Sequence, residues 1–214
     1  MTASVSLNPG QTTNFAGTFF VTSDGFTQGD ALDDVAIRYR LLPGVLALNA
    51  SVPLWGGLAI TSTLAGGSSG ISADMGYVLA PASTLTAATA GLLTGFTVLN
   101  QATAMVQSAQ SRVPYAAAGM GINWYPLGSG ARIPLKASSA GIAAWAGGLT
   151  LPNTVYWDTV NLEVTNASGS GIIGPIPGLA IWRLNSGNSR VVSYSSGTGF
   201  ANWTETGNTA VVTI

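Results

Sequence analysis

Ser68 lies in a segment with the residue spacing of a hydrolase nucleophile. Residues 66–70 match the pattern G-x-S-x-G, in which the serine stands on a sharp turn between a strand and a helix. Such a serine needs a general base, and the chain has no histidine to act as the usual one. The strand and helix that should flank the motif are also missing from the sequence pattern. The sequence therefore predicts a flexible loop here rather than a catalytic serine.

Asp158 and Glu163 are the two carboxylates that lie close together late in the chain. A strand predicted over residues 155–164 would place them on opposite faces, because side chains alternate along a strand. At about 3.3 Å per residue they would be roughly 16 Å apart, beyond the roughly 5–10 Å that separates the paired carboxyl groups of glycoside hydrolases. This spacing argues against a glycosidase, and we predict that the protein is not an enzyme.

The segment 24–34 concentrates four of the eight acidic residues, Asp24, Asp30, Asp33 and Asp34. Calcium loops are rich in carboxylates, but this spacing is not that of an EF-hand loop and it lacks the late glutamate. Zinc sites normally use histidine or cysteine, and the chain has neither. The sequence predicts a solvated acidic loop and no metal site.

Gly169, Gly171 and Gly174 have the spacing of a dinucleotide-binding fingerprint. That motif works because the pyrophosphate sits on a helix N-terminus, whereas here Pro175 and Pro177 follow at once. The segment is predicted to be a linker. No catalytic, cofactor-binding or metal-binding residue is therefore predicted anywhere in the chain, and no cofactor is expected.

The tryptophans are the remaining residues with a chemical role to assign. In β domains such large rings more often belong to the core. A tryptophan that stays exposed suits an interface anchor, whereas several exposed coplanar rings would indicate a carbohydrate-binding platform. The six are Trp55, Trp124, Trp145, Trp157, Trp182 and Trp203.

Charged residues are scarce, at 7% of the 214 residues against roughly 25% in an ordinary soluble domain. The net charge is −1 and the seven basic residues are scattered, which argues against direct nucleic-acid binding. Neither a signal peptide nor an apolar run of membrane-spanning length is visible, so we expect a soluble protein without a membrane partner, made in a cytoplasm. A surface of Ser, Thr, Asn, Gly and Ala favours a protein that partners cover in an assembly.

The predicted elements follow from alternation and turn residues, with residues 91–136 as the central stretch of the chain. A tight corner at 127–130 separates the last two strands of that stretch. Residues 43–44 predict a turn, 55–57 a bulge or a close approach of two backbones, and 87–93 a short helix. Residues 65–70 predict a flexible loop, 101–110 a helical turn or a long connection, and 137–148 a connection of small residues. Strands are predicted over residues 15–21, 35–42 (with Arg38 and Arg40 on one face), 45–50, 52–60, 96–99, 121–127, 131–136 and 155–164.

The predicted fold class is all-β, an antiparallel β-barrel or jelly-roll-like domain with a C-terminal β-meander extension. Residues 1–13 are expected to form an extended N-terminal arm, residues 14–165 the barrel or jelly-roll domain, and residues 166–214 the meander, packed on the same domain or beside it. The meander strands are predicted over 179–184, 190–194, 200–203 and 209–214, with turns at 185–188, 195–199 and 205–208.

Several stretches together resemble a family of tailed-bacteriophage structural proteins, the head cement or decoration proteins. They are distributed over residues 30–165 rather than confined to one short motif. In order they are AIRYR (36–40), PLWGG (53–57), LTGFTVLNQ (93–101), QSRVP (110–114), YPLGSGARIP (125–134) and WDTVN (157–161).

The resemblance implies a β-barrel or jelly-roll protein on the outside of an icosahedral capsid, bridging subunits of the major capsid protein and stabilising the head. It implies a virion location, self-association on the capsid lattice, and no assigned contact residues. The scarcity of charge agrees with such a role independently. Two alternatives remain: another phage structural part, such as a tail or fibre component, and a carbohydrate-binding β module.

Overall fold

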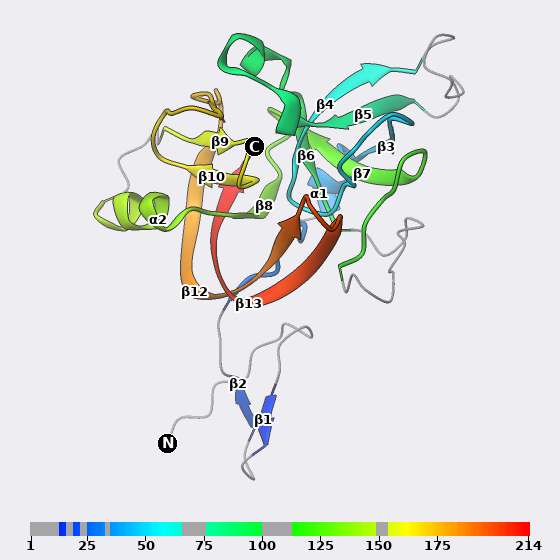
Figure 1. Ribbon diagram of the computed structural model, residues 1–214. Coiled ribbons are helices and arrows are strands. Elements are labelled where there is room, and N and C mark those ends of the chain that lie inside the picture. Colours follow the sequence, from blue (N-terminus) through cyan, green and yellow to red (C-terminus); the bar gives the residue numbers. More distant parts are fainter. Residues whose placement is uncertain are drawn as a thin grey trace.

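Five short strands close into a β-barrel in the computed structural model, which describes residues 13–15, 19–21, 25–32, 35–65, 76–99, 113–148 and 154–214 (Figure 1). The strands run around the barrel in the order β3-β5-β4-β6-β7, and every neighbouring pair is antiparallel except β3 with β5. The predicted barrel is confirmed, with one parallel pair in place of a fully antiparallel arrangement. Its strands are β3 (Leu42–Leu46), β4 (Ala59–Leu64), β5 (Tyr77–Pro81), β6 (Gly95–Thr97) and β7 (Gly121–Pro126).

The corner at 127–130 carries the chain out of the barrel into a second sheet. Gly128 and Gly130 have φ values of 80° and 77°, a region that glycine occupies without the steric penalty of a side chain. The strand that follows, β8 (Arg132–Lys136), does not pair with β7 but with β13 (Phe200–Thr213). The three strands predicted within residues 91–136 are therefore confirmed, and the corner between the last two joins two different sheets.

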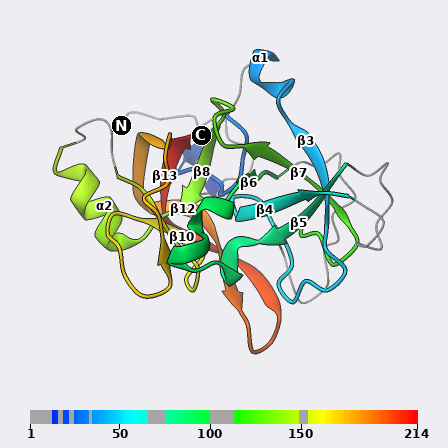
Figure 2. The same cartoon turned by 90° about the horizontal axis from the view of Figure 1, so that it is seen from above.

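The second sheet has the antiparallel order β12-β13-β8, where β12 spans Ala180–Ser195. The predicted turn at 195–199 joins β12 to β13, and Figure 2 shows this end of the hairpin projecting from the body. The predicted turns at 185–188 and 205–208 are instead irregularities within these two long strands, so the C-terminal region is one hairpin rather than a four-strand meander. Within this irregular stretch the Ser189 hydroxyl lies 2.7 Å from that of Thr209, so the two side chains pair where the backbone ladder is interrupted.

A third small sheet replaces the single strand predicted over 155–164. Its strands are β9 (Tyr156–Asp158), β10 (Glu163–Thr165) and β11 (Ile172–Ile173), in the order β10-β9-β11. The chain reverses after β9 because the Asp158 carboxylate accepts hydrogen bonds from the backbone N–H groups of Val160 (2.8 Å) and Asn161 (2.9 Å). A side-chain capped turn of this kind leaves the hydrophobic pattern unchanged, so alternation alone did not reveal it.

Helix α2 (Ser139–Ala146) occupies the segment predicted to be a connection of small residues. The Ser138 hydroxyl caps its N-terminus by accepting a hydrogen bond from Gly141 N at 2.9 Å. Ile142 and Trp145, three residues apart, are buried on one side of the helix. Alanine, the best helix former, explains why this segment is helical despite its plain composition.

The predicted strand over 35–42 is also wrong at its start. Residues 35–38 form the short helix α1 (Val35–Arg38), closed by bonds from Arg40 N to Ile37 O and from Leu41 N to Arg38 O. The predicted turn at 43–44 lies inside β3, where a side chain on Gly44 would come within 2.7 Å of Leu79 in the parallel neighbour β5. Glycine thus serves close strand packing here rather than a chain reversal.

Between β3 and β4 the chain forms a loop, buried over residues 54–58, in place of the strands predicted over 45–50 and 52–60. Leu54, Trp55 and Leu58 fill the core from this loop. The close backbone approach predicted at 55–57 is confirmed, since a side chain on Gly56 would lie 2.7 Å from Leu99 N. A strand is excluded because Gly57 has a φ of 81°.

The remaining elements are short. The predicted helix at 87–93 is a 3₁₀ helix, η3 (Ala87–Leu92), preceded by η2 (Ala82–Thr84). The predicted strand 15–21 is instead the pair β1 (Thr13–Phe15) and β2 (Phe19–Val21), with Phe15 opposite Phe19. The predicted elements at 1–12, 66–70 and 101–110 lie outside the described residues. Among the described helices, none has the length and apolar character to cross a membrane.

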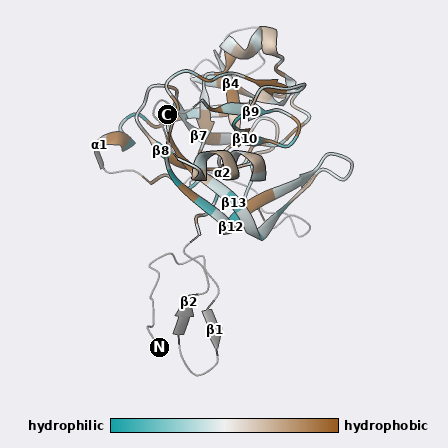
Figure 3. Cartoon of the chain, turned by 90° about the vertical axis from the view of Figure 1, so that its left-hand side faces the viewer, coloured by the Kyte–Doolittle hydropathy of each residue, from teal (hydrophilic) through white to brown (hydrophobic). Residues whose placement is uncertain are grey.

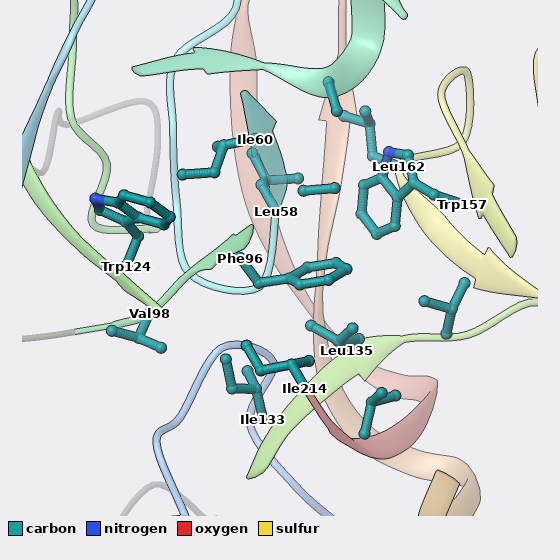
Figure 4. Packing of buried hydrophobic residues seen from close by; sticks show 14 of the residues in the cluster. Leu58, Ile60, Phe96, Val98, Trp124, Ile133, Leu135, Trp157, Leu162 and Ile214 are labelled. Carbon is teal, nitrogen blue, oxygen red and sulfur yellow. The ribbon is translucent and has the colours of Figure 1, made fainter. Parts of the chain in front are cut away.

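One hydrophobic core joins the barrel, the two other sheets and α2. Figure 4 shows Phe96 of the barrel meeting Trp157 of β9, with ring centroids 5.8 Å apart and planes at 74°. Ile133 and Leu135 of β8 and Ile214 close the core from the second sheet (Figure 4). Residues on both sides of the predicted boundary near 165 thus share one core.

Candidate docking surface

The residues considered for catalysis do not assemble into a reaction centre in the described part of the chain. Ser68 lies outside the described residues. Asp158 and Glu163, predicted to face opposite sides about 16 Å apart, are direct cross-strand partners, because the chain turns between them. Each is engaged separately: Asp158 caps its turn, and Glu163 Oε2 lies 3.2 Å from Lys136 Nζ. No group of three or more acidic residues that would suit a metal ion occurs in the described ranges.

The fingerprint-like glycines lie around a strand rather than a helix. Gly171 and Gly174 have positive φ values and flank β11, whose residue Ile173 is buried in the core. A phosphate site of the dinucleotide type needs a helix N-terminus immediately after the glycines. The segment therefore acts as part of the third sheet.

Residues 25–32, which we call the strap, tie the second sheet to the barrel. Gln28 N donates to Arg190 O (2.8 Å) in β12, and Gly29 N donates to Pro134 O (2.8 Å) in β8. On the barrel side, Leu99 N donates to Gly29 O at 2.8 Å. The strap holds these two layers through backbone bonds, and it carries the side chains of Phe26 and Asp30.

The prediction of a solvated acidic loop is wrong at Asp30. Burial in the strap raises the pKa of the Asp30 carboxyl to about 6, and the positive charge of Arg190 opposes this rise. Arg190 is shared, since its Nε lies 3.0 Å from Oε1 of Glu205 and its Cζ 4.7 Å from the ring centroid of Trp203. Asp30 therefore titrates near neutral pH rather than staying ionised throughout.

This raised pKa predicts a pH-dependent stability. The folded chain binds the Asp30 proton more tightly than the unfolded chain does, so the contribution of Asp30 is greatest below pH 4 and falls as the pH rises through about 6. We expect the Asp30→Asn variant to match the wild type near pH 4 and to be more stable at pH 8. Urea midpoints from pH 4 to 8 test this; equal midpoints of the two proteins at pH 8 would contradict it.

The six tryptophans divide sharply by exposure. Trp203 is partly buried, and Trp182 alone is exposed, at 55% of its surface. The prediction that most belong to the core is confirmed, and a platform of several exposed coplanar rings is absent from the six. The buried four are Trp55, Trp124, Trp145 and Trp157.

Trp182 is exposed because it is the extra residue of a β-bulge. Ile181 lies opposite Val212, and Arg183 lies opposite the next residue, Val211, so no residue of β13 faces Trp182. A bulge re-aims side chains and allows two consecutive residues to point to one face. Both Trp182 and Arg183 are accordingly exposed, whereas regular alternation would bury one of them.

Trp182 and Arg183 share the outer face of the second sheet with Arg132. The inner face, with Ile133, Ile181 and Val212, belongs to the core. Pairing across β13 places Arg132 and Arg183 on the opposite side. There Arg132 Cζ lies 4.8 Å from the ring centroid of Trp182, and Arg183 Cζ lies 5.0 Å from that of Phe26 in the strap.

Helix α1 and the turn after it extend this surface. Arg40 Nη1 donates to Ser129 O at 2.7 Å, three residues before Arg132. Tyr39 beside it is 86% exposed. Figure 3 shows α1 on the same side of the molecule as β8 and the C-terminus. We group the exposed or partly exposed residues Arg38, Tyr39, Arg40, Arg132, Trp182 and Arg183 under the name arginine strip; the link between its two parts is the bond from Arg40 to Ser129 at the corner.

The composition of the strip suits protein binding. Trp, Tyr and Arg are the residues enriched where a few side chains dominate the affinity of an interface. The sequence predicts that an exposed tryptophan would suit an interface anchor, but it does not indicate which of the six is exposed. A signal was present, since Trp182 and Arg183 are adjacent within an otherwise alternating strand, but only the register with β13 reveals the bulge.

Comparisons of the chain with protein-family models, with curated proteins and with solved structures found no match.

Proposed function

We propose that this chain is a non-enzymatic structural protein that binds the outer surface of a phage capsid and cements neighbouring subunits of the major capsid protein. The observation that carries the proposal is Trp182, held in the open on a rigid sheet by a bulge and by Arg132. A large exposed ring fixed in this way loses little conformational freedom on binding, which favours its use as an anchor.

Two further features support the proposal. The chain has few charges for its size, which suits a surface that partners cover. The stretches that resemble head cement proteins include residues 125–134, which contain the corner and Arg132 of the strip. The jelly-roll likeness and the self-association implied by that resemblance remain predictions and belong to the same proposal.

Such a protein would act by mass action. A chain that binds the assembled lattice and not the free subunits stabilises the lattice by its binding free energy. Many copies on a symmetric shell add their contributions, and a copy that spans two subunits gains from the high effective concentration of its second contact. No bond is made or broken in this role.

The test is co-sedimentation of the purified chain with undecorated heads of its phage, together with the disruption temperature of the heads. Saturable binding that raises this temperature is expected. If the chain does not bind heads and forms a stable trimer in solution, a tail or fibre component would be favoured. Measurable glycan affinity would favour a carbohydrate-binding module.

Trp182→Ala is expected to weaken head binding about 30-fold or more, since interface anchors contribute about 2 kcal/mol or more. The control is Phe200→Ala, which removes an exposed ring at the opposite end of the same hairpin and should leave the affinity unchanged. Circular dichroism melting checks that both variants fold. Equal affinities of the two variants would contradict the assigned surface.

A further inference from the structure

We propose that the arginine strip recognises a carboxylate-rich segment of a partner protein, with Arg132, stacked on Trp182, and Arg183, stacked on Phe26, each binding an acidic side chain. This inference rests on the proposed function, because the partner it describes is the surface on which the protein docks. It adds the chemical nature of the partner's surface, which neither the composition of the chain nor the exposed ring of Trp182 indicates.

The first support is the pairing of charges within the chain. Of the six basic residues that the structure describes, Lys136 and Arg190 form ion pairs, with Glu163 and Glu205. Among the described residues no ion pair includes a member of the strip. The strip thus holds four arginines, Arg38, Arg40, Arg132 and Arg183, whose charge is not balanced by a described partner.

The second support is the geometry of the two stacked guanidinium groups. Arg132 covers Trp182 and Arg183 covers Phe26, each with its Cζ within about 5 Å of the ring centroid. Stacking uses the flat face of a guanidinium and leaves its N–H donors at the edge. Neither group donates a hydrogen bond to a described residue, so within the described part of the chain both edges are open to a carboxylate, which Arg binds through two parallel bonds.

The third support is that both groups are already positioned. The rings restrict the rotamers of the two arginines, so less side-chain entropy is lost when an acidic group binds. The exposed ring of Trp182, which Arg132 covers, supplies apolar area, and Arg40 is held by the corner carbonyl of Ser129. A flat phosphate backbone would not need this central ring, and the chain as a whole is acidic by one charge. A carboxylate-bearing protein segment fits better than a nucleic acid.

The experiment measures head binding over a range of NaCl concentrations for wild type, Arg132→Gln, Arg183→Gln and the double variant. Each single substitution is expected to weaken binding about tenfold at 0.1 M NaCl, and the double variant should lose most of the salt dependence. Lys136→Gln is the matched control, because it removes one positive charge from an ion pair outside the strip. We expect it to stay within about twofold of wild type. Melting temperatures confirm that each variant is folded.

The outcomes separate this inference from the proposed function. Wild type that fails to bind heads at any salt concentration overturns the cementing role itself. If the wild type binds heads and the double variant binds them equally well at every salt concentration, the carboxylate partner alone is overturned. Binding to a linear DNA duplex with the same affinity and the same dependence on the two arginines would identify nucleic acid as the partner and would also overturn it.

Discussion

Trp157→Ala is expected to lower the free energy of unfolding by about 3–5 kcal/mol, the usual effect of removing a fully buried tryptophan. Trp157 has no exposed surface, and its ring meets Phe96 edge-on with centroids 5.8 Å apart. This contact joins the third sheet to the barrel, so its loss leaves a cavity between two layers. Urea denaturation followed by circular dichroism measures the change.

Trp157→Phe is the control for this prediction. The indole Nε1 of Trp157 is buried and has no hydrogen-bond partner among the described residues, so phenylalanine removes this donor while it keeps most of the ring. We expect a loss clearly smaller than that of alanine. Equal losses for the two variants would show that the ring itself does not hold the layers together.

Gly25→Ala is the second substitution with a large expected effect, a loss of about 3 kcal/mol. A side chain at position 25 would overlap the backbone carbonyl of Asn188 and lie 2.8 Å from Cα of Ser189. Backbone atoms cannot rotate out of the way, so the strap would have to move away from β12. Because Phe26 is the next residue, weaker binding to heads should accompany the loss of stability.

Gly197→Ala provides the matched comparison. Gly197 lies in the turn between β12 and β13, and a side chain there would meet no atom within 4 Å. Its stability should stay within about 0.5 kcal/mol of wild type, as for most surface substitutions. Should both glycine variants unfold at the same urea concentration as wild type, the strap would not be the tie that its hydrogen bonds indicate.

The parts of the fold that sequence reasoning predicted are those governed by neighbouring residues. Alternation within β7 and β8, and the glycines of the corner between them, depend on local side-chain direction and on positive φ values. The errors arose where a single polar side chain changed the backbone. Asp158 turned a predicted strand into two, and Ser138 opened a helix in a predicted connection. Because such caps leave the hydrophobic pattern unchanged, a prediction based on that pattern does not detect them.

For the candidate surface, the sequence predicted the type of residue involved but not which residues come together. Sequence reasoning predicted that an exposed tryptophan would suit an interface anchor, and it found no histidine or cysteine for chemistry. It placed Arg38 and Arg40 on one face of a strand, whereas they belong to α1 and to the turn after it. It did not join them to Arg132 and Arg183, because these residues are far apart in the chain and meet only through the corner and the pairing of β13 with its neighbours.

The amino-acid sequence by itself determined that this is a mostly β protein with few charges, a glycine corner and no histidine or cysteine. Those properties follow from composition and from interactions within a few residues. Only the tertiary structure decided that Trp182 and Arg183 point to the same face and that Asp30 is partly buried in the strap. Both depend on which distant strands pair and in what register, and a shift of one residue in register reverses the face that every side chain occupies.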